Sequence, residues 1–223
     1  MKISVIVLLA GLLVAGYSQE WQHNFTFHAA FAFPQGDFAD ANEKIGGYAD
    51  MGFGGGVEYT LYVGDFDLGW VSSLNYITNE YGNNMFTRGP DLAIMHTSAY
   101  ESWAFTTGVK LKKDLSDNFI PFFTAQAGFT HVQPPYFDGR YVDEEENVYG
   151  STFTFNAENG LAYQFGLGAV INRNFTISMR YVNLDDHSFQ GDITYIEEVE
   201  DLPRKAVWDQ SVAVFYLTLG YTL

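Results

Sequence analysis

Residues 211–223, SVAVFYLTLGYTL, decide the fold, and they form the last stretch of the chain. Successive side chains of an extended strand point to opposite faces, so the odd-numbered residues from 213 to 223 share one side. That side is apolar or aromatic throughout, whereas the other side carries small and mixed residues. An apolar strand at the open edge of a sheet invites aggregation, and a closed barrel removes the edge. The sequence therefore predicts a barrel in which this strand pairs with the first one.

The composition limits the class of protein and its partners. The chain has 223 residues, enough for one large all-β domain, and 17 % of them are aromatic. A formal charge of −16 argues against nucleic acid as a partner, because phosphate binding needs a basic face. The absence of cysteine excludes disulfides and thiolate metal sites, and we expect no cofactor.

The N-terminus has the pattern of an export signal. Lys2 supplies a positive start, residues 3–15 form an apolar run, and residues 16–18, Gly-Tyr-Ser, match a small-x-small cleavage site. We therefore predict a signal peptide over residues 1–18 and one barrel domain over residues 19–223. No later segment approaches the roughly 18–20 apolar residues that a membrane-spanning helix needs. A membrane location would therefore depend on strands.

From Trp21 onward, apolar and polar residues alternate in eight segments: 21–33, 48–63, 66–76, 102–111, 123–130, 161–171, 175–182 and 211–223. The connections between them alternate between long and short, which is typical of an outer-membrane barrel. Only one face of each strand is strongly apolar, and the ionisable residues lie on the other. The predicted fold is an all-β, eight-stranded, antiparallel up-and-down transmembrane β-barrel. Its expected interfacial girdles contain Trp70, Tyr76, Trp103, Tyr163, Tyr181 and Tyr221.

Two motifs add a family resemblance. The first strand exits through FAFPQGDF, residues 31–38, and the last strand ends at Leu223, with Tyr221 two residues earlier. With the strand pattern, these motifs resemble the small outer-membrane β-barrel domain of OmpX-, OmpA- and OmpW-like proteins. The resemblance implies a bacterial outer-membrane location, contact with outer-membrane lipid, and recognition of the C-terminal strand by the insertion machinery. It implies no single activity, since fold does not fix function.

Inward positions of the expected strands collect ionisable and amide side chains: Glu58, Asp67, Lys110, Arg180, His28, Gln126 and Gln164. An eight-stranded barrel is just wide enough for side chains to fill its interior. Because an unpaired buried charge is costly, we expect these groups to form a salt-bridge and hydrogen-bond plug, with Arg180 and Glu58 as the first pair. The alternative is a narrow gated pore lined by the same groups.

The sequence contains no strong catalytic or metal-binding pattern. The five histidines are scattered without the spacing of metal ligands. Asp186, His187 and Ser188 are the residue types of a hydrolytic triad, but a triad needs separated residues that converge in space. We therefore expect a protein that is not an enzyme. The alternative is a lipid-modifying outer-membrane enzyme, a class that does occur on eight-stranded barrels.

The long loops carry the remaining surface features. Acidic runs occupy residues 143–146 and 197–201, where we expect a solvated surface, with weak divalent-cation binding as the alternative. Residues 193–196, ITYI, would let the last two strands extend as a hairpin whose edge accepts a partner strand. We expect a monomer with a structural or surface-interaction role. A soluble lipocalin-like barrel would require the apolar faces to point inward.

Overall fold

The computed structural model describes residues 21–40, 47–64, 66–82, 92–116, 118–142, 148–195 and 204–223. The expected signal peptide and both acidic runs lie outside these residues. The elements in chain order are β1 (Trp21–Gln35), η2 (Gly36–Phe38), β2 (Ala49–Val63), β3 (Leu68–Tyr81), β4 (Leu92–Thr97), β5 (Tyr100–Lys112), β6 (Phe119–Gln133), β7 (Phe137–Val142), β8 (Val148–Phe155), β9 (Glu158–Ile171), β10 (Phe175–Tyr195) and β11 (Lys205–Thr222). In this part of the chain, no helix has both the length and the apolar character needed to cross a membrane.

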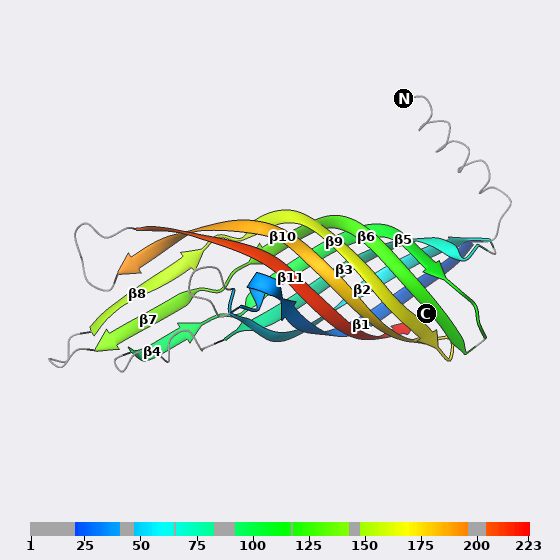
Figure 1. Cartoon of the computed structure of the whole chain (residues 1–223), viewed down its shortest axis with the longest axis horizontal. Helices are drawn as coiled ribbons and strands as arrows, with labels where there is room; N and C mark the ends of the chain where they lie inside the picture. The colour runs from blue at the N-terminus through cyan, green and yellow to red at the C-terminus, as the bar shows by residue number, and fades with distance from the viewer. Residues whose placement is uncertain are drawn as a thin grey trace, which may run out of the picture.

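Eight antiparallel strands close into a barrel in the order β1, β2, β3, β5, β6, β9, β10 and β11 (Figure 1). The ring closes because β11 pairs with β10 on one side and with β1 on the other. Phe27 lies opposite Tyr221, and backbone hydrogen bonds join Phe25 and Leu223 in both directions. The predicted eight-stranded antiparallel barrel is confirmed, including the pairing of its first and last strands.

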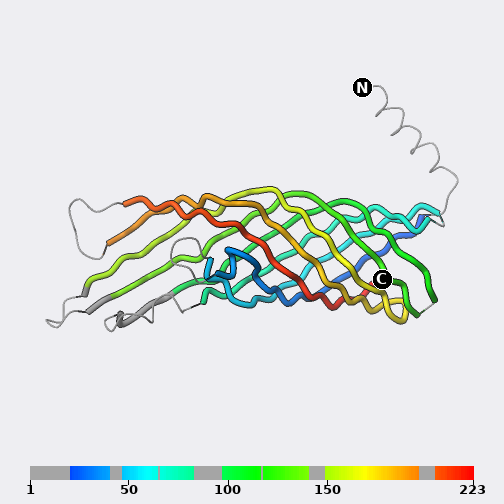
Figure 2. The backbone as a smooth tube through the Cα atoms, viewed as in Figure 1, coloured from blue at the N-terminus to red at the C-terminus, as the bar shows by residue number. Residues whose placement is uncertain are grey.

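The connections are sorted between the two ends of the barrel. Residues 64–67, 113–118 and 172–174 make short connections at one end, which also holds the start of β1 and the end of β11 (Figure 2). We call this the turn end, and the opposite end the loop end. Asn172 and Arg173 both have positive φ, 50° and 71°. Two such residues in succession match the twist of a tight hairpin, which explains why β9 can turn directly into β10.

Beyond the loop end the sheet continues as an open blade (Figure 1). β10 is 21 residues long; its last part pairs with β8, which pairs with β7, which in turn pairs with β4. Asp192 lies opposite Lys205, so β10 and β11 project together as expected. Contrary to what the sequence suggested, the edge of β10 at residues 193–195 is not open to a partner strand, because it pairs with β8. The term blade is used below for β4, β7, β8, residues 186–195 of β10 and residues 205–211 of β11.

The sequence interpretation was wrong about two long connections. Residues 79–97 and 133–159 were expected to be loops, but they contain β4, β7 and β8. β8 reads VYGSTFTF, in which threonine alternates with phenylalanine over residues 152–155. Hydroxyl residues lower the apolar content of such a segment, although threonine and phenylalanine both fit a pleated strand well. A polar appearance therefore concealed a strand of period two.

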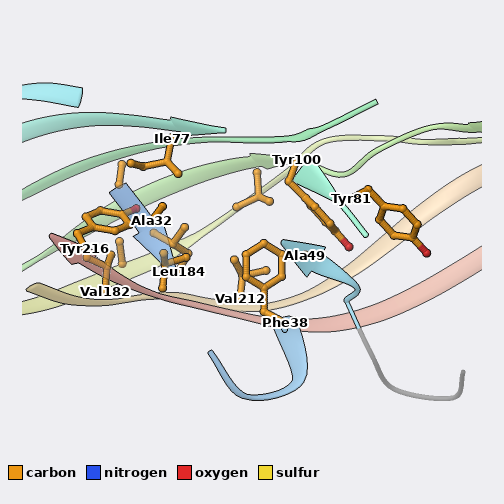
Figure 3. Packing of buried hydrophobic residues seen from close by; sticks show 14 of the residues in the cluster. Ala32, Phe38, Ala49, Ile77, Tyr81, Tyr100, Val182, Leu184, Val212 and Tyr216 are labelled. Atoms are coloured by element: carbon orange, nitrogen blue, oxygen red, sulfur yellow. The ribbon is translucent and has the colours of Figure 1, made fainter. Parts of the chain in front are cut away.

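Side chains are divided by chemistry between the outside and the inside of the barrel. Outward positions on the wall are mostly large and apolar, and Phe53, Phe129 and Leu161 keep 65 %, 69 % and 62 % of their surface exposed. This is the reverse of what a soluble lipocalin-like barrel requires. Inside, the loop end is filled by an apolar cluster that includes Ala32, Phe38, Ile77, Tyr100, Val182, Leu184, Val212 and Tyr216 (Figure 3). The turn end of the interior is polar.

Candidate functional site

The polar half of the interior is built around Glu58. Its Oε1 lies 2.7 Å from Lys110 Nζ, and its Oε2 lies 2.8 Å from Arg180 Nη2. The side chains of all three residues are buried, with 1 %, 6 % and 1 % of their surface exposed for Glu58, Lys110 and Arg180. The contact with Lys110 is also a hydrogen bond, whereas the contact with Arg180 lacks hydrogen-bond angles and is an ion pair. One carboxylate therefore serves two cations.

Three distant strands bring these charges together. Glu58 comes from β2, Lys110 from β5 and Arg180 from β10, each at an inward position of its strand. Arg180 Nε donates to Ser178 Oγ at 3.2 Å, and Lys110 Nζ lies 4.1 Å from the centre of the Phe122 ring. The long cationic side chains can therefore cross the interior because alternation places all three residues on the same face of the sheet.

A layer of amides and hydroxyls lies beside the charges. Ser73 Oγ and Thr106 Oγ1 donate to Gln126 Oε1 at 2.6 Å and 3.0 Å. Gln164 Nε2 donates to the same two hydroxyls, at 3.2 Å and 2.9 Å. Both glutamines are buried, with 4 % exposed for Gln126 and none for Gln164. Side-chain hydrogen bonds in the interior of the described barrel therefore link strands that are not neighbours in the sheet, such as β3 with β9.

Of the two remaining residues predicted for the interior network, His28 lies inside the barrel and Asp67 does not. His28 is buried, and its Nε2 lies 3.0 Å from Asn75 Oδ1, so it lines the interior as expected. Asp67 does not: it lies in the turn before β3, and its Oδ2 pairs with Lys113 Nζ at 3.3 Å on the surface. The sequence placed Asp67 inside the barrel because period two was continued past the real start of the strand. Its assignment to the interior network was wrong.

The Asp186-His187-Ser188 segment does not form a triad. It belongs to β10, where Asp186 and Ser188 are exposed and His187 is buried on the opposite face. The His187 ring stacks on Phe189, with ring centres 5.2 Å apart, and its Nε2 lies 2.6 Å from the carbonyl oxygen of Leu184. Neighbouring residues of a strand point to opposite faces, so these three cannot converge on one substrate.

In the described residues, the pairing of β9 with β10 is interrupted at the loop end. Ladder pairing of these strands ends at Asn183 opposite Tyr163, and β10 pairs with β8 only from Gly191, opposite Phe155. Residues 184–189 of β10 therefore have no ladder partner on this side. We call this opening the seam. It lies at the loop end, next to the apolar cluster that includes Leu184.

Two carboxylates bridge the seam in place of backbone pairs. Asp185 Oδ2 accepts the amide N–H of Leu161 at 2.9 Å, and Glu158 Oε2 accepts the amide N–H of Ser188 at 3.0 Å. The hydrogen bonds from the backbone amides of Leu161 and Asp186 lower the pKa of Asp185. His187 Nδ1 lies 3.9 Å from Glu158 Oε2, behind the bridge. The seam is therefore closed by side chains, which move more easily than a paired backbone.

Aromatic rings gather where the blade meets the barrel. Trp208 lies at their centre, with ring centres 5.6 Å from Phe155, 5.7 Å from Phe137 and 5.8 Å from Tyr100. Burial raises the pKa of the Tyr100 phenol, whose oxygen donates to the carbonyl oxygen of Gly47 at 2.7 Å. The sequence analysis missed this aromatic cluster because several of its members lie in the supposed loops. The alternation of aromatic residues in β8 is the signal that would have found it.

Known proteins resemble the chain in structure and not in sequence. No protein-family model and no curated protein matches it. The crystal structure of Ail, the attachment invasion locus protein of Yersinia pestis, is similar at 14 % identity and a TM-score of 0.48, over 90 % of this chain and 97 % of that one. The outer membrane protein OprG from Pseudomonas aeruginosa is similar at 14 % identity and a TM-score of 0.47, over 90 % and 95 % of the two chains. No group of histidine, aspartate and glutamate in the described residues is arranged to hold a metal ion.

Proposed function

We propose that the protein is a non-catalytic β-barrel of the bacterial outer membrane, with a lumen plugged by side chains and a blade that presents a surface for interaction. The observation that carries this proposal is the division of the wall: apolar side chains point outward and polar ones inward. Water would make such an exterior an aggregation hazard, whereas lipid is its natural solvent.

The outer surface supports a bilayer orientation. Trp70 and Tyr221 lie near the turn end, with 54 % and 45 % exposed, and Trp103 and Tyr163 lie toward the loop end, with 47 % and 44 % exposed. Tyr76 and Trp103 touch, with ring centres 4.6 Å apart. The outward side chains between the two levels are mostly apolar, and the hydroxyls of Ser72 and Thr107 there bond to each other. Aromatic rings at two levels with such a band between them are typical of the two membrane–water interfaces.

The interior supports a plug and not a wide pore. The ion pairs of Glu58 and the bonds of Gln126 and Gln164 occupy the interior and link strands two or three places apart in the ring. Above them lies the apolar cluster, in which Ala32, Phe189 and Leu184 have no exposed surface. An ion would have to break the first layer and lose its hydration in the second, so we expect no measurable conductance.

Two measurements test the proposal. The mature chain, folded in detergent and run on a gel without boiling, should migrate faster than the boiled chain, because a closed barrel resists the detergent. The same sample in a planar bilayer should show no steady conductance. A chain that is soluble without detergent and shows no shift would contradict the membrane assignment, and regular conductance steps would contradict the plug.

The seam favours one second function, a route for small apolar solutes. The seam connects the apolar cluster at the loop end with the outer surface of the wall, where Leu161 is exposed. A solute entering among the aromatic rings would pass between β9 and β10 without meeting the ion pairs of Glu58. Opening requires that Asp185 and Glu158 release two amides and that the buried Leu184, His187 and Phe189 shift.

Cross-linking the seam tests this second function. The chain has no cysteine, so Gly160→Cys with Asp185→Cys, where the Cβ of residue 160 would stand 2.9 Å from the Cβ of residue 185, adds the only two thiols. In proteoliposomes, the wild type should speed the entry of an apolar dye such as N-phenylnaphthylamine, and the oxidised pair should abolish that gain until it is reduced. A wild type that gives no gain over empty liposomes would exclude the route and leave the plugged barrel unaffected.

A further inference from the structure

The charges inside the barrel do not balance. Among the described residues, Glu58 is the one acidic side chain in the buried set, whereas Lys110 and Arg180 are both buried cations. With His28 neutral, this leaves one positive charge without a counter-charge in the polar half of the interior. The nearest other charged groups, at the turn end, form pairs of their own: Lys113 with Asp67 and Lys112 with Asp114.

Protein groups cannot readily remove this excess. The guanidinium of Arg180 does not lose its proton at any ordinary pH. The ammonium of Lys110 is 2.7 Å from a Glu58 carboxylate oxygen and 4.1 Å from the centre of the Phe122 ring, an anion and an aromatic face that both attract a cation. A net charge held away from water inside an apolar wall is costly, so it needs a counter-ion.

The structure also shows hydrogen-bond donors suited to such an ion. Arg180 Nη1 has no hydrogen-bond partner among the described residues, although Nη2 faces Glu58 and Nε bonds to Ser178. The Thr124 hydroxyl is likewise buried without a partner in this part of the chain. Both side chains flank Gly166, where a Cβ would stand 2.7 Å from Thr124 Oγ1 and 3.0 Å from Arg180 Cγ. The Thr124 hydroxyl on β6 and the stem of the Arg180 side chain on β10 therefore lie on either side of Gly166 of β9, where no side chain separates them.

From this charge imbalance and these donors, we propose that the interior binds one small monovalent anion of chloride size beside Arg180. The ion supplies the missing negative charge and accepts hydrogen bonds from Arg180 Nη1 and the Thr124 hydroxyl. It is small because eight strands leave little open section. The protein as a whole carries a charge of −16, so this site is a locally positive region within an acidic molecule.

The test changes the interior charge in steps. The chain is refolded in a zwitterionic detergent, in either sodium chloride or sodium gluconate of equal ionic strength. Because the anion is present while the barrel forms, it does not have to enter a closed barrel. Samples are heated to a series of temperatures in the same salt and then separated by gel electrophoresis in the cold. The unfolding midpoint is the temperature at which half of the chain migrates as the unfolded band. The midpoint of the wild type should be a few degrees higher in chloride, and the gain should level off as chloride rises.

Three variants identify where chloride acts. Lys110→Met leaves the neutral Glu58–Arg180 pair, so its midpoint should be the same in both salts. Glu58→Gln raises the excess to two charges, so its chloride gain should exceed that of the wild type. Lys113→Met removes an exposed cation, with 70 % of the side chain accessible, and should behave as the wild type does.

The outcomes are decisive in both directions. Equal midpoints of the wild type in the two salts would overturn the proposal, and would mean that Lys110 is neutral or that water alone hydrates Arg180. An unchanged chloride gain in Lys110→Met would overturn it as well, because chloride would then act elsewhere. If Glu58→Gln does not fold, the pair Lys110→Met and Lys113→Met still decides the question.

Discussion

At the scale of single residues, the pairing of Arg180 with Glu58 has the clearest consequence. In Arg180→Met, Glu58 keeps only Lys110, so the barrel should fold but lose about 1–3 kcal/mol of stability, the cost of leaving a buried carboxylate oxygen without a partner. The matched control is Lys113→Met, which breaks an exposed pair worth less than about 1 kcal/mol. The two variants are compared by the temperature at which half of each chain shifts from the folded to the unfolded gel band. If Arg180→Met melts at the wild-type temperature, the pair contributes nothing.

Asp185 gives a prediction on pH. Its pKa is lowered by the amides of Leu161 and Asp186, so its contribution is present above the ordinary aspartate pKa, near 4. That contribution is lost as the pH falls through the lower pKa of the folded state. Protection of the Leu161 amide from hydrogen exchange should therefore stay constant from pH 7 to about 4 and fall below that. In Asp185→Asn, a protection profile identical to that of the wild type at every pH would contradict the bridge.

Residue types could predict the charges of the interior but not all of their positions. Glu58, Lys110 and Arg180 lie inside and meet because alternation fixes a face for each residue within a strand. Asp67 shows the limit, since the same alternation gives the wrong face once the strand has ended. Asp185 shows another limit, because it adopts a φ of 82° at the irregular pairing between β10 and β11. The residue types around it do not predict that bulge.

At the scale of elements, adjacent strands lie close where glycine faces a neighbouring backbone. A Cβ at Gly108 of β5 would collide with the carbonyl oxygen of Ala125 on β6, whereas a Cβ at Gly139 of β7 would meet nothing within 4 Å. Gly108→Ala should therefore cost about 1–3 kcal/mol through overpacking, and Gly139→Ala should be close to neutral. The fraction that refolds in detergent, measured as the fast gel band, tests the pair. Equal refolding of the two variants would show that the strands separate without cost.

The elements of the barrel were predictable, and those of the blade were not. In the wall, lipid on one side and packed side chains on the other impose strict alternation, which the sequence displays from Trp21 onward. In the blade, both faces contact either water or a few aromatic rings, so serine and threonine replace apolar residues in β8. The seam was equally hidden, because strand pairing depends on which residues lie opposite each other and not on their individual types.

At the scale of the whole molecule, the account rests on which side of the wall faces lipid. Three of the four tryptophans distinguish the two orientations of the wall. Trp70 and Trp103 point outward with 54 % and 47 % exposed, whereas Trp208 packs against the apolar cluster inside. The single most direct measurement is fluorescence quenching by lipids with brominated acyl chains, using variants that keep one tryptophan and carry phenylalanine at the other three positions. We predict strong quenching of Trp70 and Trp103 and little quenching of Trp208. Quenching of Trp208 as strong as that of Trp103, or no quenching at any position, would contradict a barrel embedded in lipid.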